Sequence, residues 1–369
     1  MLKKILSFLI FIIFCAGLAF ALFKYPEFFK RQVNKVQGMY YIYQGDRQYR
    51  KWNLQRAIRY YQNGLRLYPS HYTAWTNLGN IYIAYEDYYS ATDAYEEAIK
   101  YNPKYVVARM NYGIVSTEKL GDFDGAIEQY NAILDTKRRL LSIPFIYNNR
   151  RSTKTNKGLA YYNRGVAYKQ KSLYTSSDNW ELKRKYLKDA LESYISASKI
   201  LKKDYDTRYN LALAQHLLGD YHDAGLNYCK AIELAPMNYD AHYNLAILLK
   251  HLRYYKESLN ELEKATNLIT NSEGATNRQR YIFDVMNDVT KIVLAQSETS
   301  LVENLDGTPA DADGSELTMI DGKLVKAEDL DKAMLKNFRT CQAKKIFKED
   351  ITDDYDSLNL DNHAPVRLP

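Results

Sequence analysis

Cysteine is scarce in this sequence, and its few positions argue against a cysteine-based framework. The 369 residues include three cysteines. Cys15 lies inside an apolar run, while Cys229 and Cys341 fall in different predicted modules of the chain. Two remaining cysteines in separate modules make a poor disulfide framework and have no metal-site spacing. We therefore expect neither a stapled fold nor a cysteine metal site.

Histidine and the familiar catalytic motifs are equally sparse. Among the six histidines, His242 and His251 belong to one predicted helix but do not share a face. An acidic stretch at 311–314 suggests a calcium loop, yet Pro309 and Ile320 stand where such a loop needs oxygen ligands. No Ser/His/Asp, Cys/His, phosphate-loop or paired-carboxylate arrangement is recognisable. The sequence predicts no enzyme, no cofactor and no metal.

Charge is unevenly distributed along the chain. Residues 301–369 carry 9 basic and 15 acidic side chains, a balance of −6, so residues 1–300 must carry +13 to give the net charge of +7. No compact Lys/Arg cluster with interleaved aromatics occurs, so nucleic acid is not an expected partner. Acidic peptides, anionic lipid or the chain's own tail fit the basic portion better.

One long apolar run stands at the N-terminus. Residues 5–23 contain no charged side chain over 19 residues, which is long enough for a membrane-spanning helix. We favour a single-pass anchor within residues 1–30. A cleaved signal peptide is the first alternative, because Ala19-Phe20-Ala21 fits a small-x-small cleavage site, and a merely buried helix is the second. Lys3 and Lys4 favour repeats on the extracytoplasmic side, although basic residues also follow the run.

A fixed period of 34 residues governs the central part of the chain. Small, aromatic and proline residues recur at this spacing: Gly45, Gly79 and Gly113; Ala57 and Ala91; Tyr61 and Tyr95; Pro69 and Pro103. A repeat of this length is typical of stacked helical hairpins, in which each hairpin covers an apolar face of the next.

The residue types at this period resemble the tetratricopeptide repeat family. The resemblance rests on Trp75, Leu78, Gly79, Tyr82, Ala91, Tyr95, Ala98 and Pro103. It implies an all-α, right-handed superhelical solenoid of about six helix-turn-helix repeats plus a capping helix. We place the repeats at 38–71, 72–105 and 106–140, and at 158–204, 205–238 and 239–272, which gives a 38–140 block and a 158–272 block.

Departures from the period indicate local changes. Repeat three has one extra residue before Gly121, and repeat four has thirteen inserted residues between Gly165 and Ala190. Asp178 followed by Glu181 predicts a capping box that opens a long second helix, ending near residue 203. We favour a lengthened hairpin over a dedicated binding element. Residues 141–157 are predicted to be a linker.

The C-terminal part is predicted from its composition. Residues 273–301 are expected to form a capping helix, and 302–369 an acidic, flexible tail. Within the tail, Asp321-Gly322 suggests a small hairpin, and residues 326–347 suggest an amphipathic helix. This pair is either a docking segment or a small module.

The resemblance also implies a binding groove, because the first helix of each repeat lines the concave side in that family. Tyr162, Tyr209 and Tyr243 recur at one position and should form an aromatic ladder. The predicted groove of repeats four to six comprises Tyr162, Val166, Lys169, Tyr209, Leu213, His216, Tyr243, Ile247 and Lys250. Asparagines recur in register beside it, at Asn77, Asn111, Asn163, Asn210 and Asn244, and we expect them to make structural hydrogen bonds.

Together these features favour a membrane-anchored scaffold or adaptor that binds a protein or peptide partner in its groove. One alternative is a regulatory array attached to a small C-terminal module in residues 317–350. Another is a secreted or periplasmic assembly factor, released after signal cleavage. Homo-oligomerisation through the repeats is a third hypothesis.

Overall fold

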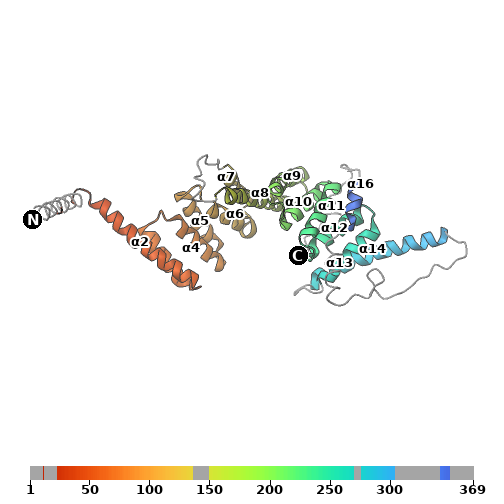
Figure 1. Ribbon diagram of the computed structural model, residues 1–369, viewed down its shortest axis with the longest axis horizontal. Coiled ribbons are helices and arrows are strands. Elements are labelled where there is room, and N and C mark those ends of the chain that lie inside the picture. Colours follow the sequence, from red (N-terminus) through yellow and green to blue (C-terminus); the bar gives the residue numbers. More distant parts are fainter. Residues whose placement is uncertain (1–10, 12–22, 136–148, 270–275, 304–340, 350–369) are drawn as a thin grey trace, which may run out of the picture. The chain divides into compact units, whose positions relative to one another are not determined.

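The computed structural model describes residue 11 and residues 23–135, 149–269, 276–303 and 341–349. Every regular element in these ranges is a helix, and most helices follow one another as hairpin pairs (Figure 1). The chain divides into two compact units, residues 1–138 and 139–369. The predicted all-α fold of repeated helical hairpins is confirmed.

Unit one contains three helical hairpins. Their first helices are α2 (Pro26–Arg50), α4 (Tyr72–Ala84) and α6 (Val106–Val115), and their second helices are α3 (Leu54–Leu67), α5 (Tyr88–Tyr101) and α7 (Phe123–Leu134). Helix α2 begins well before residue 38, the predicted start of repeat one. Pro26 at its first turn suits this beginning, since that position needs no amide donor.

Unit two contains three further hairpins, a long helix and a short C-terminal segment. The hairpins are α8 (Asn149–Tyr174) with α9 (Trp180–Ile200), α10 (Tyr205–Leu218) with α11 (Tyr221–Leu234), and α12 (Tyr239–His251) with α13 (Tyr255–Ile269). Helix α14 (Thr276–Glu303) follows, and then a 3₁₀ turn, η2 (Gln342–Lys345), and α16 (Ile346–Glu349). Because α8 begins at Asn149, the second half of the predicted 141–157 linker is helical.

In four of the hairpins, a glycine of the first helix contacts a tyrosine of the second helix. A Cβ atom on Gly79 of α4 would lie 2.6 Å from the Tyr95 ring of α5, so only glycine admits the ring there. Equivalent contacts join Gly45 to Tyr61, Gly113 to Tyr130 and Gly165 to Tyr194. These four tyrosines are buried, and each fills the space inside its own hairpin.

The extra residue of repeat three is absorbed inside a helix. Residues Ser116–Leu120 form one π-helical turn directly after α6, and Gly121 then ends the helix with φ 70°. A π turn accommodates one additional residue without breaking the helix, and a left-handed ending favours glycine. The hairpin therefore keeps its packing despite the insertion.

The insertion of repeat four lengthens its hairpin. Helix α8 has 26 residues and α9 has 21, whereas α10 has 14. The predicted Asp178–Glu181 capping box is wrong, because Asn179 is the N-cap and its side chain accepts a hydrogen bond from the Leu182 amide at 3.4 Å. Helix α9 also ends at Ile200, before the predicted end near residue 203.

Helix α14 covers the last hairpin. Ile282 and Val289 are fully buried against Leu262 and Ala265 of α13 and against Tyr243 of α12. A solenoid needs such a helix, because its last repeat otherwise leaves an apolar face exposed. The cap removes that face from water.

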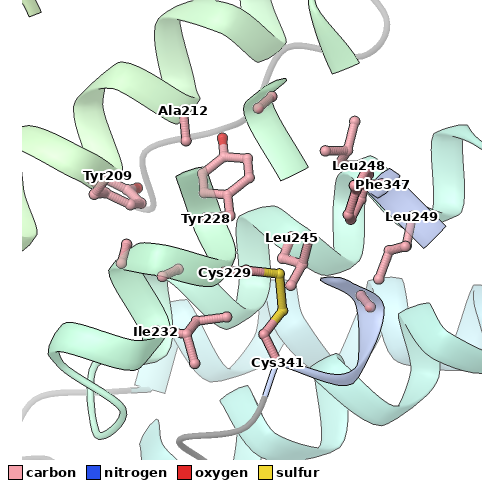
Figure 2. Packing of buried hydrophobic residues seen from close by; sticks show 14 of the residues in the cluster. Tyr209, Ala212, Tyr228, Cys229, Ile232, Leu245, Leu248, Leu249, Cys341 and Phe347 are labelled. Atoms are coloured by element: carbon pink, nitrogen blue, oxygen red, sulfur yellow. A yellow bond between two sulfur atoms is a disulfide. The ribbon is translucent and has the colours of Figure 1, made fainter. Parts of the chain in front are cut away.

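The C-terminal segment corrects the prediction for the cysteines. Cys229 of α11 and Cys341 form a disulfide across 112 residues, with Cα atoms 5.3 Å apart. The prediction that these cysteines lie in separate modules was wrong, because Phe347 packs into the core of unit two and places Cys341 beside α11 (Figure 2). Residues 342–345 are also a 3₁₀ turn and not part of the predicted amphipathic helix.

The remaining tail predictions lie outside the described residues. These are the flexible stretch, the hairpin around Asp321 and most of the amphipathic helix.

Candidate functional site

The predicted groove positions lie on α8, α10 and α12, the first helices of three consecutive hairpins. Helix α10 contacts both α8 and α12, so the three helices form one continuous surface, here named the first-helix face. Four of the nine predicted groove residues are half-buried and present part of their surface to solvent: Tyr162, Val166, Ile247 and Lys250. These four side chains are partly accessible to solvent, and Ile247 also packs against the cluster beneath α14.

The other five predicted residues are buried in this structure: Lys169, Tyr209, Leu213, His216 and Tyr243, each at most 5% exposed. Tyr209 packs beside Ala212 and Tyr228 in the core around the disulfide. Tyr243 packs beneath the capping helix α14. Their contact with a partner stays a prediction, and in this structure they support the face from below.

The tyrosine ladder is joined by hydrogen bonds between repeats. The Asn244 amide donates to the Tyr209 hydroxyl at 2.7 Å, and the Asn210 amide donates to the Tyr162 hydroxyl at 3.4 Å. Each bond connects one repeat with the next. Asn210 also accepts a hydrogen bond from the Lys169 ammonium at 2.7 Å, so the buried cation is solvated by an amide oxygen.

Unit one uses the same asparagine register with different partners. The hydroxyl of Tyr61 donates to Asp46 at 2.6 Å, and the amide of Asn77 donates to the same Asp46 oxygen at 3.2 Å. Asn80 of repeat two accepts hydrogen bonds from Tyr95 of the same repeat at 2.8 Å and from Asn111 of repeat three at 2.9 Å. The predicted structural role of the asparagines at these positions is confirmed.

The tyrosine hydroxyls of unit one are fixed donors. Burial raises the pKa of Tyr61 well above its ordinary value, and the hydrogen bond to Asp46 raises it further. Burial likewise raises the pKa of Tyr95. Both hydroxyls therefore keep their protons at physiological pH, and these two bonds, each inside one repeat, do not depend on pH in that range.

A buried charged cluster between α12 and α13 was not predicted. His242 Nδ1 lies 2.6 Å from Glu261, and Glu261 lies 2.8 Å from the Lys264 ammonium. All three side chains are buried. Burial alone would raise the pKa of Glu261, but the hydrogen bond from His242 and the charge of Lys264 outweigh it and lower that pKa.

The repeat register could have indicated this cluster, because His242 stands at the repeat position of Trp75. The His242 Nε2 atom lies 3.1 Å from the carbonyl oxygen of Pro236, six residues earlier. Trp75 makes the equivalent bond to Pro69 at 2.8 Å. A histidine at the position of that tryptophan thus keeps the contact with the preceding repeat and adds a second nitrogen, which meets Glu261. The cluster is accordingly a packing device in this fold.

Within the described residues, no group of three or more His, Cys, Asp or Glu side chains is arranged to hold a metal ion.

Comparison with known proteins identifies the repeat. Three family models described as "Tetratricopeptide repeat" match residues 44–88, 72–105 and 205–238. Residues 44–105 and 205–238 are therefore recognised as tetratricopeptide repeats. Two of the matched ranges coincide with the repeats predicted at 72–105 and 205–238. A further 87-residue match, 24% of this chain, is 32% identical to Tetratricopeptide repeat-containing protein trd-1 of Caenorhabditis elegans and spans 11% of that protein.

Several solved structures are also similar to this chain. One reports Pseudomonas aeruginosa pilF, with 15% identity and a TM-score of 0.46, over 68% of this chain and 99% of that one. Another is a thermophilic TPR protein in Thermus thermophilus, with 20% identity and a TM-score of 0.42, over 57% and 98%. A third is MamA 41-end from Desulfovibrio magneticus RS-1, with 18% identity and a TM-score of 0.41, over 53% and 94%.

The predicted N-terminal anchor lies almost entirely outside the residues that the structure describes. In the portion of the chain that the structure describes, no helix combines the length and apolarity needed to cross a membrane. The run at residues 5–23 lies outside that portion except for Phe11 and Phe23.

Proposed function

We propose that this chain is a membrane-anchored tetratricopeptide repeat scaffold, and not an enzyme, that binds a protein or peptide partner on the first-helix face of unit two. The observation that carries the proposal is the hydrogen-bonded ladder beneath that face. Because Tyr162 and Tyr209 are each held by an asparagine of the next repeat, the surface is organised before a partner arrives.

The accessible residues of the face suggest the chemistry of the partner. Tyr162 and Val166 of α8 and Ile247 of α12 offer half-buried apolar surface, which suits apolar side chains spaced along an extended or helical peptide. Lys250 lies 3.8 Å from Asp288 of α14, and this pair is partly exposed. An exposed pair of this kind is weak, so an acidic group of the partner can replace Asp288. We therefore favour an apolar peptide with acidic residues.

Charged substitutions on the face test this proposal. We expect Val166→Glu and Ile247→Glu to abolish capture of the partner from cross-linked native membranes, because each places a charge in an apolar contact. Leu173→Glu is the matched control, since Leu173 lies on α8 as well but is 56% exposed and outside the predicted set. Equal capture by all three variants, with equal thermal stability, would move the binding surface elsewhere.

The proposed location is a single-pass membrane anchor at residues 5–23 with the repeats on the extracytoplasmic side. The disulfide between Cys229 and Cys341 supports this side, because disulfides persist in oxidising compartments and are rare in the cytosol. The alternative is a secreted or periplasmic repeat protein released by signal cleavage.

Alkylation of the protein in intact cells tests the orientation. We expect Cys229 and Cys341 to resist a maleimide reagent until a reductant is added, whereas free thiols at both positions would contradict an oxidising location. The N-terminal mass of the same sample decides between the anchor and the cleaved form.

Two other hypotheses remain distinct from the scaffold. A regulatory array with a separate module at 317–350 is disfavoured at its C-terminal end, because Phe347 is buried in the core of unit two. A homo-oligomer formed through the repeats would give a solution mass of two or more copies without any partner, as light scattering would show.

A further inference from the structure

The short segment Cys341–Glu349 is bound to unit two at three points. Cys341 is linked to Cys229, Phe347 is fully buried, and the Lys344 ammonium forms an ion pair with Glu233 of α11. The covalent, apolar and ionic contacts all converge on α11 and the neighbouring α12. A nine-residue segment held in three ways occupies a specific site.

That site is complementary to one aromatic ring. A Cβ atom on Gly225 of α11 would lie 2.3 Å from the Phe347 ring, so the ring occupies the space left by a missing side chain. Figure 2 shows Phe347 beside Leu248 and Leu249 of α12, with the disulfide nearby. We name Gly225, Cys229, Leu248 and Leu249 the acceptor site. It differs from the first-helix face, because two of its residues come from α11, the second helix of its hairpin.

The disulfide is enclosed by the segment that it holds. Cys229 is 0% exposed and Cys341 is 6% exposed. Thiol–disulfide exchange needs a thiolate to approach one sulfur in line with the bond, so a buried disulfide reacts only after local opening. Release of the Phe347 ring and reduction of the disulfide are therefore coupled.

We propose that residues 341–349 are a thiol-controlled cover for the acceptor site. A dithiol reductant of the thioredoxin class attacks the Cys341 sulfur, forms a mixed disulfide and then closes to its own disulfide. The Cys229–Cys341 bond breaks and the two sulfurs gain two electrons and two protons. After reduction, residues 341–349 dissociate from the acceptor site and bind to it again reversibly. Reoxidation of Cys229 and Cys341 fixes the segment on the site.

Reduction kinetics of the full-length protein test the coupling. Under native conditions, dithiothreitol should reduce the disulfide roughly tenfold faster in Phe347→Ala and in Gly225→Ala than in the wild type, because each loosens the covered state. Gly225→Ala serves as the second variant, since alanine favours the helix while its methyl displaces the ring. Leu173→Ala, distant in sequence and exposed, is the control. Equal rates in all four proteins would overturn the proposal.

Binding of a peptide tests the occupant. The probe is a fluorescent peptide of residues 337–350 with Cys341→Ser, and its matched control also carries Phe347→Ala. The receptor is the full-length chain with Cys341→Ser and Phe347→Ala, checked for folding by circular dichroism. We expect the probe to bind this opened chain. The control peptide should not bind the opened chain, and the probe should not bind the oxidised wild type.

Three results would contradict the assignment. The probe fails to bind the opened, folded chain; it binds the oxidised wild type equally well; or the reduced wild type forms a tail-exchanged dimer, in which the occupant is the segment of a second copy. Each of these outcomes leaves the first-helix face untouched, so failure here is distinguishable from failure of the proposed scaffold function.

Discussion

At the scale of single residues, tyrosine hydroxyls and asparagine amides connect consecutive repeats. Asn244 reaches Tyr209, and Asn77 reaches Asp46, so a polar side chain crosses between repeats in each unit. A buried donor without its acceptor costs more than the bond itself contributes, which makes these contacts specific for register. Each asparagine amide and its acceptor therefore fix the register between adjacent repeats together.

The ladder gives a prediction for Tyr209. Tyr209→Phe should lower the free energy of unfolding by about 1–3 kcal/mol, because the buried Asn244 amide loses one of its two acceptors and keeps only the Asp240 carbonyl oxygen. Tyr162→Phe should cost less, since Tyr162 is half-buried and its contact with Asn210 is longer, at 3.4 Å. Urea unfolding followed by circular dichroism measures both. A larger loss for Tyr162→Phe would show that the hydroxyl contacts are not the cause.

The buried charged cluster gives a prediction for pH. Glu261 has a pKa below its ordinary value of 4.5 in the folded protein, so the unfolded chain binds this proton more readily. Its contribution is complete above pH 4.5 and is lost as the pH falls through the folded pKa. We expect acid to destabilise unit two more in the wild type than in Glu261→Gln.

The quantity compared between the two proteins is the dependence of stability on pH, not the stability at a single pH. Glu261→Gln itself should cost about 3–5 kcal/mol, because it leaves the buried Lys264 ammonium without its charged partner. Thermal unfolding on both sides of pH 4.5 compares the two proteins. An equal dependence on pH would mean that Glu261 does not carry the effect.

At the scale of elements, each hairpin depends on the fit between its two helices. Gly79→Ala should destabilise repeat two by about 1–3 kcal/mol, because its methyl meets the Tyr95 ring. Tyr95→Leu in the same protein should recover part of that loss, since the smaller side chain makes room. Differential scanning calorimetry of the single and double variants checks this. Additive losses would place the cause outside the ring contact.

The disulfide is the second device at this scale. Cys229→Ser should be less stable than the oxidised wild type by about 2–4 kcal/mol. The variant lacks the disulfide, which closes a long covalent loop in the unfolded state. Reduction of the wild type should give a similar loss. Thermal unfolding with and without reductant measures both, and an unchanged melting temperature after reduction would contradict the contribution.

The elements show which parts of the fold a sequence can predict. The register of Gly79, Tyr95 and Trp75 predicted the hairpins, since these residues make contacts inside one repeat or between adjacent repeats. The Cys229–Cys341 pair and the Phe347 contact were missed, because 112 residues separate the partners and no period connects them. The candidate site was predicted as positions that line a groove, but the burial of Tyr209 and Tyr243 depends on neighbouring helices.

At the scale of the whole molecule, the chain divides into two compact units. Unit two has the first-helix face and the covered acceptor site, while unit one holds its own hairpins and exposed positions such as Met39 and Val107. In a repeat protein, stability spreads mainly between neighbours. We therefore expect Gly79→Ala to leave the protection of α11 unchanged.

Hydrogen exchange measures this independence. The amides of α4 and α5 should exchange faster in Gly79→Ala, whereas those of α11 should keep the wild-type rate. Faster exchange in both places would show that the two units unfold together.

The most direct test of the account is site-specific photo-cross-linking in native membranes. A photoreactive phenylalanine is placed at Val166 or Ile247 of the first-helix face, and at Leu173 of α8 as the exposed control. We predict that Val166 and Ile247 form adducts with one and the same protein and that Leu173 does not. Adducts from Leu173 alone, or none from either face position in a correctly folded protein, would contradict a partner bound to this face.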